Sequence, residues 1–459
     1  MAEMIGTDTR RVVLGLGKTG HSIAAWLSAQ GKSFRIMDTR DSPPYLEAVT
    51  ALCPGDGIAV GGWRHDWLAE ATELYVSPGI ALAEPEIQQA LDRGASLISD
   101  VDIYCQYTTA SVIAVTGSNG KSTVVSLLTE MARAAGLDAM AGGNIGTPVL
   151  ELLDQPHDVA ILELSSFQLE MTHSLQADVA MVLNVSPDHM DRYPDMLAYR
   201  AAKHRIFNGC RRVVFHADDP LTQPLVSEEM PQQAYALGRR DLGLLSIESD
   251  ALGIHLFQGV EALHTWPALK IKGSHNALNV LSAMSVASLM EWDQPAVLAT
   301  IERYPGLPHR CEWVAEIKGV TFINDSKGTN VGATLAALDG LAPECAGRLH
   351  LLAGGDGKSA DFKSLGEACV RLNIALQTYG RDGDAVAAAA REQGADVVCH
   401  ATLNDALSSA WQVAQPGDWV LLSPACASFD QYQSFEARGE AFVAAVNDLD
   451  SDDAAREAV

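Results

Sequence analysis

The chain has 459 residues, 47% of them hydrophobic, and a formal net charge of −26. It is too long for one compact core, so we expect three domains. The strong negative charge excludes DNA or RNA as the main partner, because a phosphate backbone must be met by a basic surface. Small anionic ligands remain compatible with this composition, since their sites need only a few lysines and arginines.

The beginning of the chain and its cysteines predict a cellular location. The first residues lack the basic start, long apolar run and cleavage site of a secretory signal. No later window offers the roughly eighteen uncharged apolar residues of a membrane span. The eight cysteines form no C-x-x-C pair, so neither a disulfide framework nor a structural zinc site is expected. A reducing cytoplasm fits these features best.

The first elements in chain order form a predicted βαβ unit. They are a strand at 11–16, a glycine turn at 15–20, a helix to residue 30 and a strand at 34–38. A further apolar run, at 73–76, ends in Ser77-Pro78-Gly79. These elements predict a small parallel α/β domain that ends near residue 99.

Two further α/β patterns follow the first. The second has predicted strands at 111–116, 159–164 and 179–184, with a helix at 121–135. The last two of these strands are too apolar for one-sided exposure, so we expect them at the centre of a parallel sheet. The third pattern starts near residue 310. Its predicted strands, which alternate with alanine-rich helices, are 320–324, 349–353 and 419–423.

A glycine-containing loop joins the first strand of the second pattern to its helix. The loop reads Thr116-Gly117-Ser118-Asn119-Gly120-Lys121-Ser122-Thr123. Backbone N–H groups and the helix dipole at such a turn hold phosphate oxygens. Lys121 would contact the β- and γ-phosphates of ATP, and the hydroxyl of Ser122 or Thr123 would hold Mg²⁺. Because the glycine spacing is shorter than in G-x-x-x-x-G-K-[ST], a chance glycine turn is the alternative.

The earlier turn, Gly15-x-Gly17-x-x-Gly20, matches the dinucleotide-binding fingerprint. Asp38 ends the next strand, where an acid that binds a ribose would lie. Taken alone, this pattern indicates NAD and a dehydrogenase. It reports diphosphate binding rather than hydride transfer, however, so other nucleotide diphosphates are compatible with it.

Two polar clusters follow strands of the second pattern, at the edge where α/β folds bind ligands. Glu163 lies near the end of one strand, and His189 lies in the loop 184–193 after the next. An ordinary ion pair for Glu163 and a packed loop histidine for His189 are the alternatives. Their shared position beside the phosphate loop favours metal binding.

Lysines in two small-residue turns of the third pattern suit an anionic ligand, and solvated loops are the alternative. Lys327 follows one strand and Lys358 follows another. Cys426, after the 419–423 strand, is interpreted as a packed small residue rather than a nucleophile. Lys203 lies on a predicted helix, where a lysine is normally a solvated surface charge.

Together these motifs resemble the Mur ligase family over nearly the whole chain, in order and at compatible spacing. The loop 116–123 is similar to the ATP loop of that family, which shares its short spacing. The segments 15–20, 38–40, 188–193 and 423–428 resemble the members that add D-glutamate. The chain lacks the Asp-Asn-Pro-Arg sequence of the relative that adds a diamino acid.

The resemblance implies three α/β domains and the residues that serve each ligand. The domains are a Rossmann-like UDP-sugar domain at 1–99, a central P-loop ATPase-type domain with a mostly parallel sheet at 100–307, and a Rossmann-like amino-acid domain at 308–459. The ATP-binding residues would be Gly117, Ser118, Asn119, Gly120, Lys121, Ser122, Thr123, Asn276, Arg310 and Asp325. The UDP-substrate residues would be Leu16, Lys18, Thr19, Gly20, Asp38, Thr39, Arg40, Ser77, Pro78, Gly79, Asn144 and His189. D-glutamate would contact Lys327, Thr329, Lys358, Ser428 and Phe435.

The resemblance further implies the catalytic and metal-binding residues. The catalytic residues would be Lys121, His189 and a carbamylated Lys203. The metal ligands would be Ser122, Glu163, His189 and Lys203, for two Mg²⁺ ions. His189 is a candidate acceptor for the amine proton, although its metal role competes.

The implied reaction joins D-glutamate to UDP-N-acetylmuramoyl-L-alanine at the expense of ATP. ATP first phosphorylates the alanyl carboxylate, and the amine of D-glutamate then attacks the acyl phosphate. We expect a monomer whose partners are these small molecules alone. A nicotinamide-dependent dehydrogenase, a folylpolyglutamate-synthase-like ligase and a non-catalytic nucleotide-binding module are the alternatives.

Overall fold

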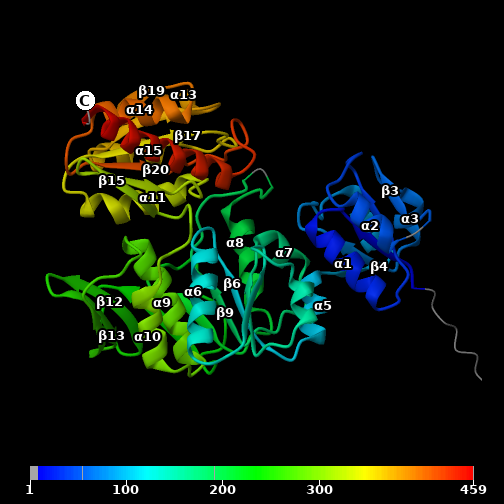
Figure 1. The fold of residues 1–459 in the computed structure, drawn as a ribbon. Helices are drawn as coiled ribbons and strands as arrows, with labels where there is room; N and C mark the ends of the chain where they lie inside the picture. Colours follow the sequence, from blue (N-terminus) through cyan, green and yellow to red (C-terminus); the bar gives the residue numbers. More distant parts are fainter. Residues whose placement is uncertain (1–8, 54, 191, 458–459) are drawn as a thin grey trace, which may run out of the picture.

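The computed structural model describes residues 9–53, 55–190 and 192–457. It contains three β-sheets, each built from one continuous stretch of the chain and flanked by helices (Figure 1). The predicted α/β class with three domains is therefore confirmed. Among the described residues, no helix combines the length and the apolar character needed to cross a membrane.

The N-terminal sheet has the strand order β3-β2-β1-β4-β5, with all strands parallel. Its strands are β1 (Arg11–Leu14), β2 (Arg35–Asp38), β3 (Ile58–Val60), β4 (Glu73–Val76) and β5 (Ser96–Ile98). Its helices are α1 (Lys18–Ala29), α2 (Leu46–Leu52), α3 (His65–Glu70) and α4 (Pro85–Asp92). Helix α5 (Asp100–Tyr107) leads into the central sheet. The strand predicted to reach Leu16 ends at Leu14, because the Leu16 N–H turns aside to the Asp38 carboxylate at 2.7 Å.

The central sheet has the order β14-β13-β12-β11-β10-β9-β6-β8-β7, and it is parallel from β7 to β12. Its parallel strands are β6 (Ser111–Thr116), β7 (Ala139–Gly143), β8 (Val159–Glu163), β9 (Val179–Val182), β10 (Val213–His216), β11 (Gln232–Leu237) and β12 (Leu244–Asp250). Alternate residues of β6 enter two separate cores, Val112 and Ala114 on one face and Ile113 and Val115 on the other. Strands β8 and β9, which were predicted to be central, are buried at every residue and each lies between two other parallel strands, which confirms that prediction.

Helices cover both faces of this sheet and carry the loops that form the site. The helical elements are α6 (Lys121–Ala134), η1 (Val149–Asp154), α7 (Ser166–Met171), α8 (Met196–His204), η2 (Arg205–Phe207), α9 (Ser274–Leu289) and α10 (Gln294–Arg303). The sequence analysis did not find the antiparallel end of the sheet, β13 (Gly253–Gln258) and β14 (Glu261–Trp266). These strands mix apolar residues with histidine, glutamine and threonine, so they lack the apolar run that marked the central strands.

The C-terminal sheet has the order β15-β16-β20-β17-β18-β19, with only the β15–β16 pair antiparallel. Its strands are β15 (Glu312–Ile317), β16 (Val320–Asn324), β17 (Leu349–Gly354), β18 (Ala375–Tyr379), β19 (Asp396–Cys399) and β20 (Trp419–Leu422). Its helical elements are α11 (Val331–Leu341), η3 (Ala342–Glu344), α12 (Lys363–Arg371), α13 (Gly383–Glu392), α14 (Leu403–Val413) and α15 (Phe435–Glu457). Helix α11 packs against α9, so the loop that precedes α11 lies over the central sheet.

Candidate active site

The loop between β6 and α6 has the conformation of a phosphate-binding turn. Gly120 has a φ of +83°, and a Cβ there would lie 2.6 Å from the Asn279 Oδ1 atom, so both the backbone and the space require glycine. The loop is anchored to the next one, because the Asn119 N–H donates to Asn184 Oδ1 at 2.9 Å. The N-terminus of α6 follows this loop directly, and the first N–H groups of a helix have no partner within the helix, so they are suited to bind an anion.

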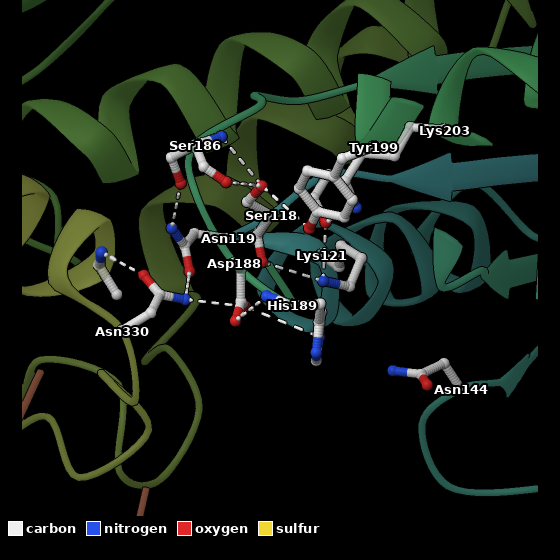
Figure 2. A network of polar contacts seen from close by, with 12 residues as sticks. Ser118, Asn119, Lys121, Asn144, Ser186, Asp188, His189, Tyr199, Lys203 and Asn330 are labelled. Carbon is white, nitrogen blue, oxygen red and sulfur yellow. Dashed lines mark hydrogen bonds and ion pairs between the residues drawn. The ribbon is translucent and has the colours of Figure 1, made fainter. Parts of the chain in front are cut away.

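Two lysines converge on one carbonyl group of this loop (Figure 2). Lys121 Nζ donates to the Gly117 oxygen at 2.8 Å, and Lys203 Nζ donates to the same oxygen at 2.9 Å. Burial lowers the pKa of both lysines, and the charge of Lys121 lowers that of Lys203 further. Lys203 is only 2% exposed, so it is not the solvated surface lysine that its helix pattern indicated.

Glu163 lies at the end of β8 with one oxygen bound and the other without a partner. Its Oε1 atom accepts a hydrogen bond from Asn144 Nδ2 at 2.8 Å, while Oε2 is buried and makes no hydrogen bond. A buried carboxylate oxygen without a partner is costly and calls for a cation. Within the described ranges, no three His, Cys, Asp or Glu side chains group as a metal site. This donor set fits Mg²⁺, which is typically held by one or two carboxylates together with substrate phosphates and water.

His189 lies in the loop after β9, with a φ of +56°. Its ring lies 4.8 Å from that of Phe167 and 6.5 Å from that of Tyr199, measured between centroids. Lys203 Nζ lies 4.5 Å from the centre of the Tyr199 ring. An aromatic cluster therefore joins His189 to Lys203. Asp191, in the same predicted motif, is outside the described residues.

A cavity of about 260 Å³ lies between the phosphate loop, α9 and the third domain. Asn276, Arg310 and Asp325, all predicted for ATP, line it together with Lys327. Arg310 Nη2 donates to Ser122 Oγ at 2.5 Å, which links the third domain to the phosphate loop. Burial raises the pKa of Asp325 to about 6, against the opposing effects of Ser423 and Arg310.

Several lining residues of this cavity were not predicted from the sequence, namely His216, Tyr235, His275, Asn279 and Cys311. The rings of His216 and Tyr235 stack with centroids 5.4 Å apart, which leaves a flat surface beside the cavity. These two residues come from β10 and β11, far along the chain from the glycine loop. No local pattern in the sequence marks them, because only strand pairing brings them to the cavity.

Of the residues predicted for D-glutamate, four lie on loops of the third domain and Phe435 begins helix α15. Lys327 Nζ lies 3.8 Å from the centre of the Phe435 ring, and burial lowers the pKa of Lys327 to about 8. The Thr329 N–H donates to the Lys327 carbonyl at 2.7 Å. The loops that carry Lys358 and Ser428 pair through two hydrogen bonds between Asp356 and Ala427. Lys358 has a φ of +47°, a strained conformation often found at binding sites.

The N-terminal domain holds the turn that was predicted to bind a diphosphate. A Cβ at Gly20 would lie 1.7 Å from the Gly15 carbonyl oxygen, which explains the last glycine of the fingerprint. Burial of Asp38 would raise its pKa, but hydrogen bonds from Arg40 and Leu16 lower the value to about 2. Asp38 is thus an anion that orders the turn.

This turn also faces the central domain. Lys18 Nζ donates to the Gly146 carbonyl, two residues beyond Asn144. The predicted UDP residue Asn144 therefore belongs to a loop that contacts the N-terminal turn, although its own side chain binds Glu163. Thr39 and Arg40 follow β2, and Ser77, Pro78 and Gly79 follow β4, so both groups lie at the same edge of the parallel sheet.

The fold and the loop define a three-domain α/β protein of the P-loop type. Three domain families match its sequence: "Mur ligase MurD-like, N-terminal domain" at residues 9–99, "Mur ligase middle domain" at 115–287, and "Mur ligase, glutamate ligase domain" at 309–426. The chain belongs to the Mur ligase family, whose members are ATP-dependent ligases that form amide bonds.

Individual relatives agree with this assignment. The UDP-N-acetylmuramoylalanine–D-glutamate ligase of Nitrosococcus oceani is 46% identical over 439 residues, which cover 95% of this chain and 96% of that protein. MurF from Acinetobacter baumannii has a TM-score of 0.59 at 17% identity, over 94% of this chain and 92% of that one. FolC from E. coli, solved with DHPP and ADP, has a TM-score of 0.55 at 17% identity, over 78% and 93%. At these identities the two structures show a shared fold alone.

Proposed function

We propose that the chain joins D-glutamate to UDP-N-acetylmuramoyl-L-alanine with hydrolysis of ATP, in peptidoglycan precursor synthesis. The identity of 46% to a D-glutamate ligase over nearly the full length of both chains carries this proposal. The match of residues 9–99 to an N-terminal Mur ligase domain weighs against the dehydrogenase and the folylpolyglutamate-synthase-like alternatives, since neither would need a UDP-sugar domain.

The three ligands are assigned to the three domains. The turn at 15–20, with Asp38 to Arg40 and Ser77 to Gly79, would bind the UDP-sugar and direct its alanyl carboxylate toward Asn144 and His189. The loop at 117–123, with Asn276, Arg310 and Asp325, would bind ATP. Lys327, Thr329, Lys358, Ser428 and Phe435 would bind D-glutamate. We place the domain boundaries after residues 99 and 307. We expect the protein in the cytoplasm, because all three substrates are small cytoplasmic molecules. We also expect it to be a monomer.

The catalytic work assigned to the chain is positioning and charge neutralisation. Lys121 would move from the Gly117 carbonyl to the γ-phosphate as that group passes to the substrate carboxylate. The amine of D-glutamate, aligned by the third domain, then forms the C–N bond while phosphate leaves. Two Mg²⁺ ions, held by Ser122, Glu163, His189 and a modified Lys203, would supply neutralising charge on the phosphate oxygens.

Lys203 is proposed to carry a carbamate. Its neutral amine would attack CO₂, forming an N–C bond and releasing a proton to solvent. The burial that depresses its pKa favours the neutral amine that this step needs. The product is an anion with two hard oxygen ligands, whereas an ammonium would repel Mg²⁺. Lys203→Ala should lose activity, acetate should restore part of it, and an unmodified ammonium in a high-resolution map of active enzyme would refute the modification.

The decisive experiment measures phosphate release from ATP and UDP-N-acetylmuramoyl-L-alanine against a panel of D- and L-amino acids. Release should require all three substrates, and D-glutamate should be the preferred amine. Release without the sugar nucleotide, or a preference for another amino acid, would contradict the proposed function. Saturable ATP binding without turnover would identify a binding module instead.

A further inference from the structure

One loop of the third domain spans the predicted sites of two substrates and ends on the phosphate loop. After β16 it carries Asp325, on the ATP cavity, and then Lys327 and Thr329, assigned to D-glutamate. It ends at Asn330, the residue that caps the N-terminus of α11. Asn330 therefore directly follows Thr329 on the loop that carries the predicted amino-acid site.

The side chain of Asn330 makes hydrogen bonds both within its own domain and to the central domain (Figure 2). Its Oδ1 atom accepts from the Ala333 N–H at 2.8 Å, which is the helix cap within its own domain. Its Nδ2 atom donates to Asp188 Oδ2 at 3.1 Å and to Asn119 Oδ1 at 3.3 Å, both in the central domain. The Oδ1 atom thus caps the helix within its own domain. The Nδ2 group instead donates across the seam, which is the contact surface between the third and the central domain.

Both acceptors in the central domain belong to the reacting region. Asn119 is part of the phosphate loop, and Asp188 Oδ1 accepts from the His189 N–H at 2.9 Å. The seam is closely packed here, because a Cβ at Gly332 would lie 2.7 Å from Ser186 Oγ. The first turn of α11 therefore closes directly over the phosphate loop and the His189 loop.

We propose that Asn330 is a positioning residue that holds these two loops in register with the amino-acid domain. This inference rests on the proposed function. A loosened seam would admit water to the acyl phosphate. Water then breaks the bond between the carboxyl oxygen and phosphorus, or that between the carbonyl carbon and its phosphate oxygen. Either route returns the carboxylate and phosphate, with a proton to solvent, so ATP is consumed without amide formation.

The variant Asn330→Asp separates the two halves of the amide. A carboxylate still accepts from Ala333 and caps α11, so the variant should remain folded. It cannot donate, and it places a second carboxylate beside Asp188. We expect kcat to fall about 10- to 100-fold, the KM for the UDP-sugar to stay constant, and ADP formed per amide to rise above one. Asn404→Asp, which adds the same charge at an exposed position in α14, should match the wild type in every respect.

A reciprocal exchange tests the pairing itself. In Asp188→Asn/Asn330→Asp the new amide at position 188 donates to the new carboxylate at position 330. The hydrogen bond between these two positions therefore returns with its direction reversed. We expect this double variant to recover most of the kcat and the ratio of one ADP per amide. An Asn330→Asp enzyme with wild-type kcat and ratio would overturn the inference, as would a folded double variant no better than the single one. If the wild type itself makes no amide with D-glutamate, the proposed function fails instead.

Discussion

The guanidinium group of Arg192 donates hydrogen bonds to the carbonyl oxygens of Pro78, at 3.0 Å, and of Ile80, at 3.4 Å. Arg192 belongs to the central domain, whereas the two carbonyls belong to the turn after β4 of the N-terminal domain. The guanidinium carbon also lies 4.0 Å from the centre of the Phe167 ring, which contacts His189. The predicted UDP turn and the predicted metal loop are therefore parts of one contact network.

Replacing Arg192 by lysine should lower the catalytic efficiency, kcat/KM, with the UDP-sugar. Lysine keeps the positive charge but cannot span two carbonyl groups as the planar guanidinium does. We expect kcat/KM for the UDP-sugar to fall about tenfold, equivalent to the loss of one or two hydrogen bonds, while the KM for ATP changes little. Steady-state kinetics with each substrate varied in turn measures both values.

Glu170 provides the matched control for this prediction. It pairs with Arg192 Nη2 at 3.1 Å, and its side chain is 23% exposed. Glu170→Gln removes the ion pair but leaves the contacts to the N-terminal turn. It should therefore change kcat/KM less than Arg192→Lys does. Equal losses in the two variants would show that the ion pair with Glu170, rather than the hydrogen bonds to the N-terminal turn, matters.

Motifs that are continuous in sequence were predictable, because the backbone itself forms them. The strand, glycine loop and helix from β6 to α6 were placed within a residue or two, since apolar periodicity and Gly120 leave few alternatives. The buried state of Lys203 and the unpartnered oxygen of Glu163 were not readable, because the first depends on how α8 packs beside the glycine loop and the second on how β8 pairs with its neighbours. The hydrogen bonds from Asn330 to Asp188 and Asn119 have no sequence signal, because they follow from how the third domain lies over the second.

Lys121→Ala should remove most of the turnover without unfolding the protein. Its Nζ atom contacts only the Gly117 and Ser118 carbonyls among the hydrogen bonds of the described residues, so little core packing is lost. Loss of a charged group that stabilises the transferring phosphoryl group typically costs 100-fold or more in kcat. Phosphate release gives the rate, and circular dichroism checks the fold. A folded variant with near-normal release would remove Lys121 from the catalytic assignment.

Asp38 and its turn should bind the UDP-sugar and not NAD. The carboxylate is ionised above pH 2 and accepts a hydrogen bond from the Leu16 N–H. Its charge therefore stabilises the turn rather than binding a ribose. Calorimetry should show binding heat with UDP-N-acetylmuramoyl-L-alanine and none with NAD. Asp38→Asn should weaken the binding of the UDP-sugar about tenfold, because Arg40 would then donate to a neutral amide oxygen instead of a carboxylate. Tight NAD binding without UDP-sugar binding would favour the dehydrogenase over the ligase.

Asp100 should make the protein less stable at neutral pH than at mildly acidic pH. It is only 5% exposed in the first turn of α5, and burial raises its pKa from 3.8 to about 6. Because the folded state binds the proton more tightly, this carboxyl's contribution to stability is full below pH 3.8 and is lost as the pH rises through 6. Asp100→Asn should therefore raise the free energy of unfolding by about 2–3 kcal/mol at pH 8, and by little at pH 4.

Asp384 offers the control for this effect, since it is exposed in the first turn of α13. Asp384→Asn removes the same charge from a comparable helix position, but without burial. It should lose a few tenths of a kcal/mol, because the helix dipole favours an anion there, and so it should not show the gain in stability expected of Asp100→Asn at pH 8. Urea unfolding of both variants and the wild type at these two pH values measures the differences. If Asp100→Asn were no more stable than the wild type at pH 8, Asp100 would have to be paired or hydrated in solution, and the raised pKa would be wrong.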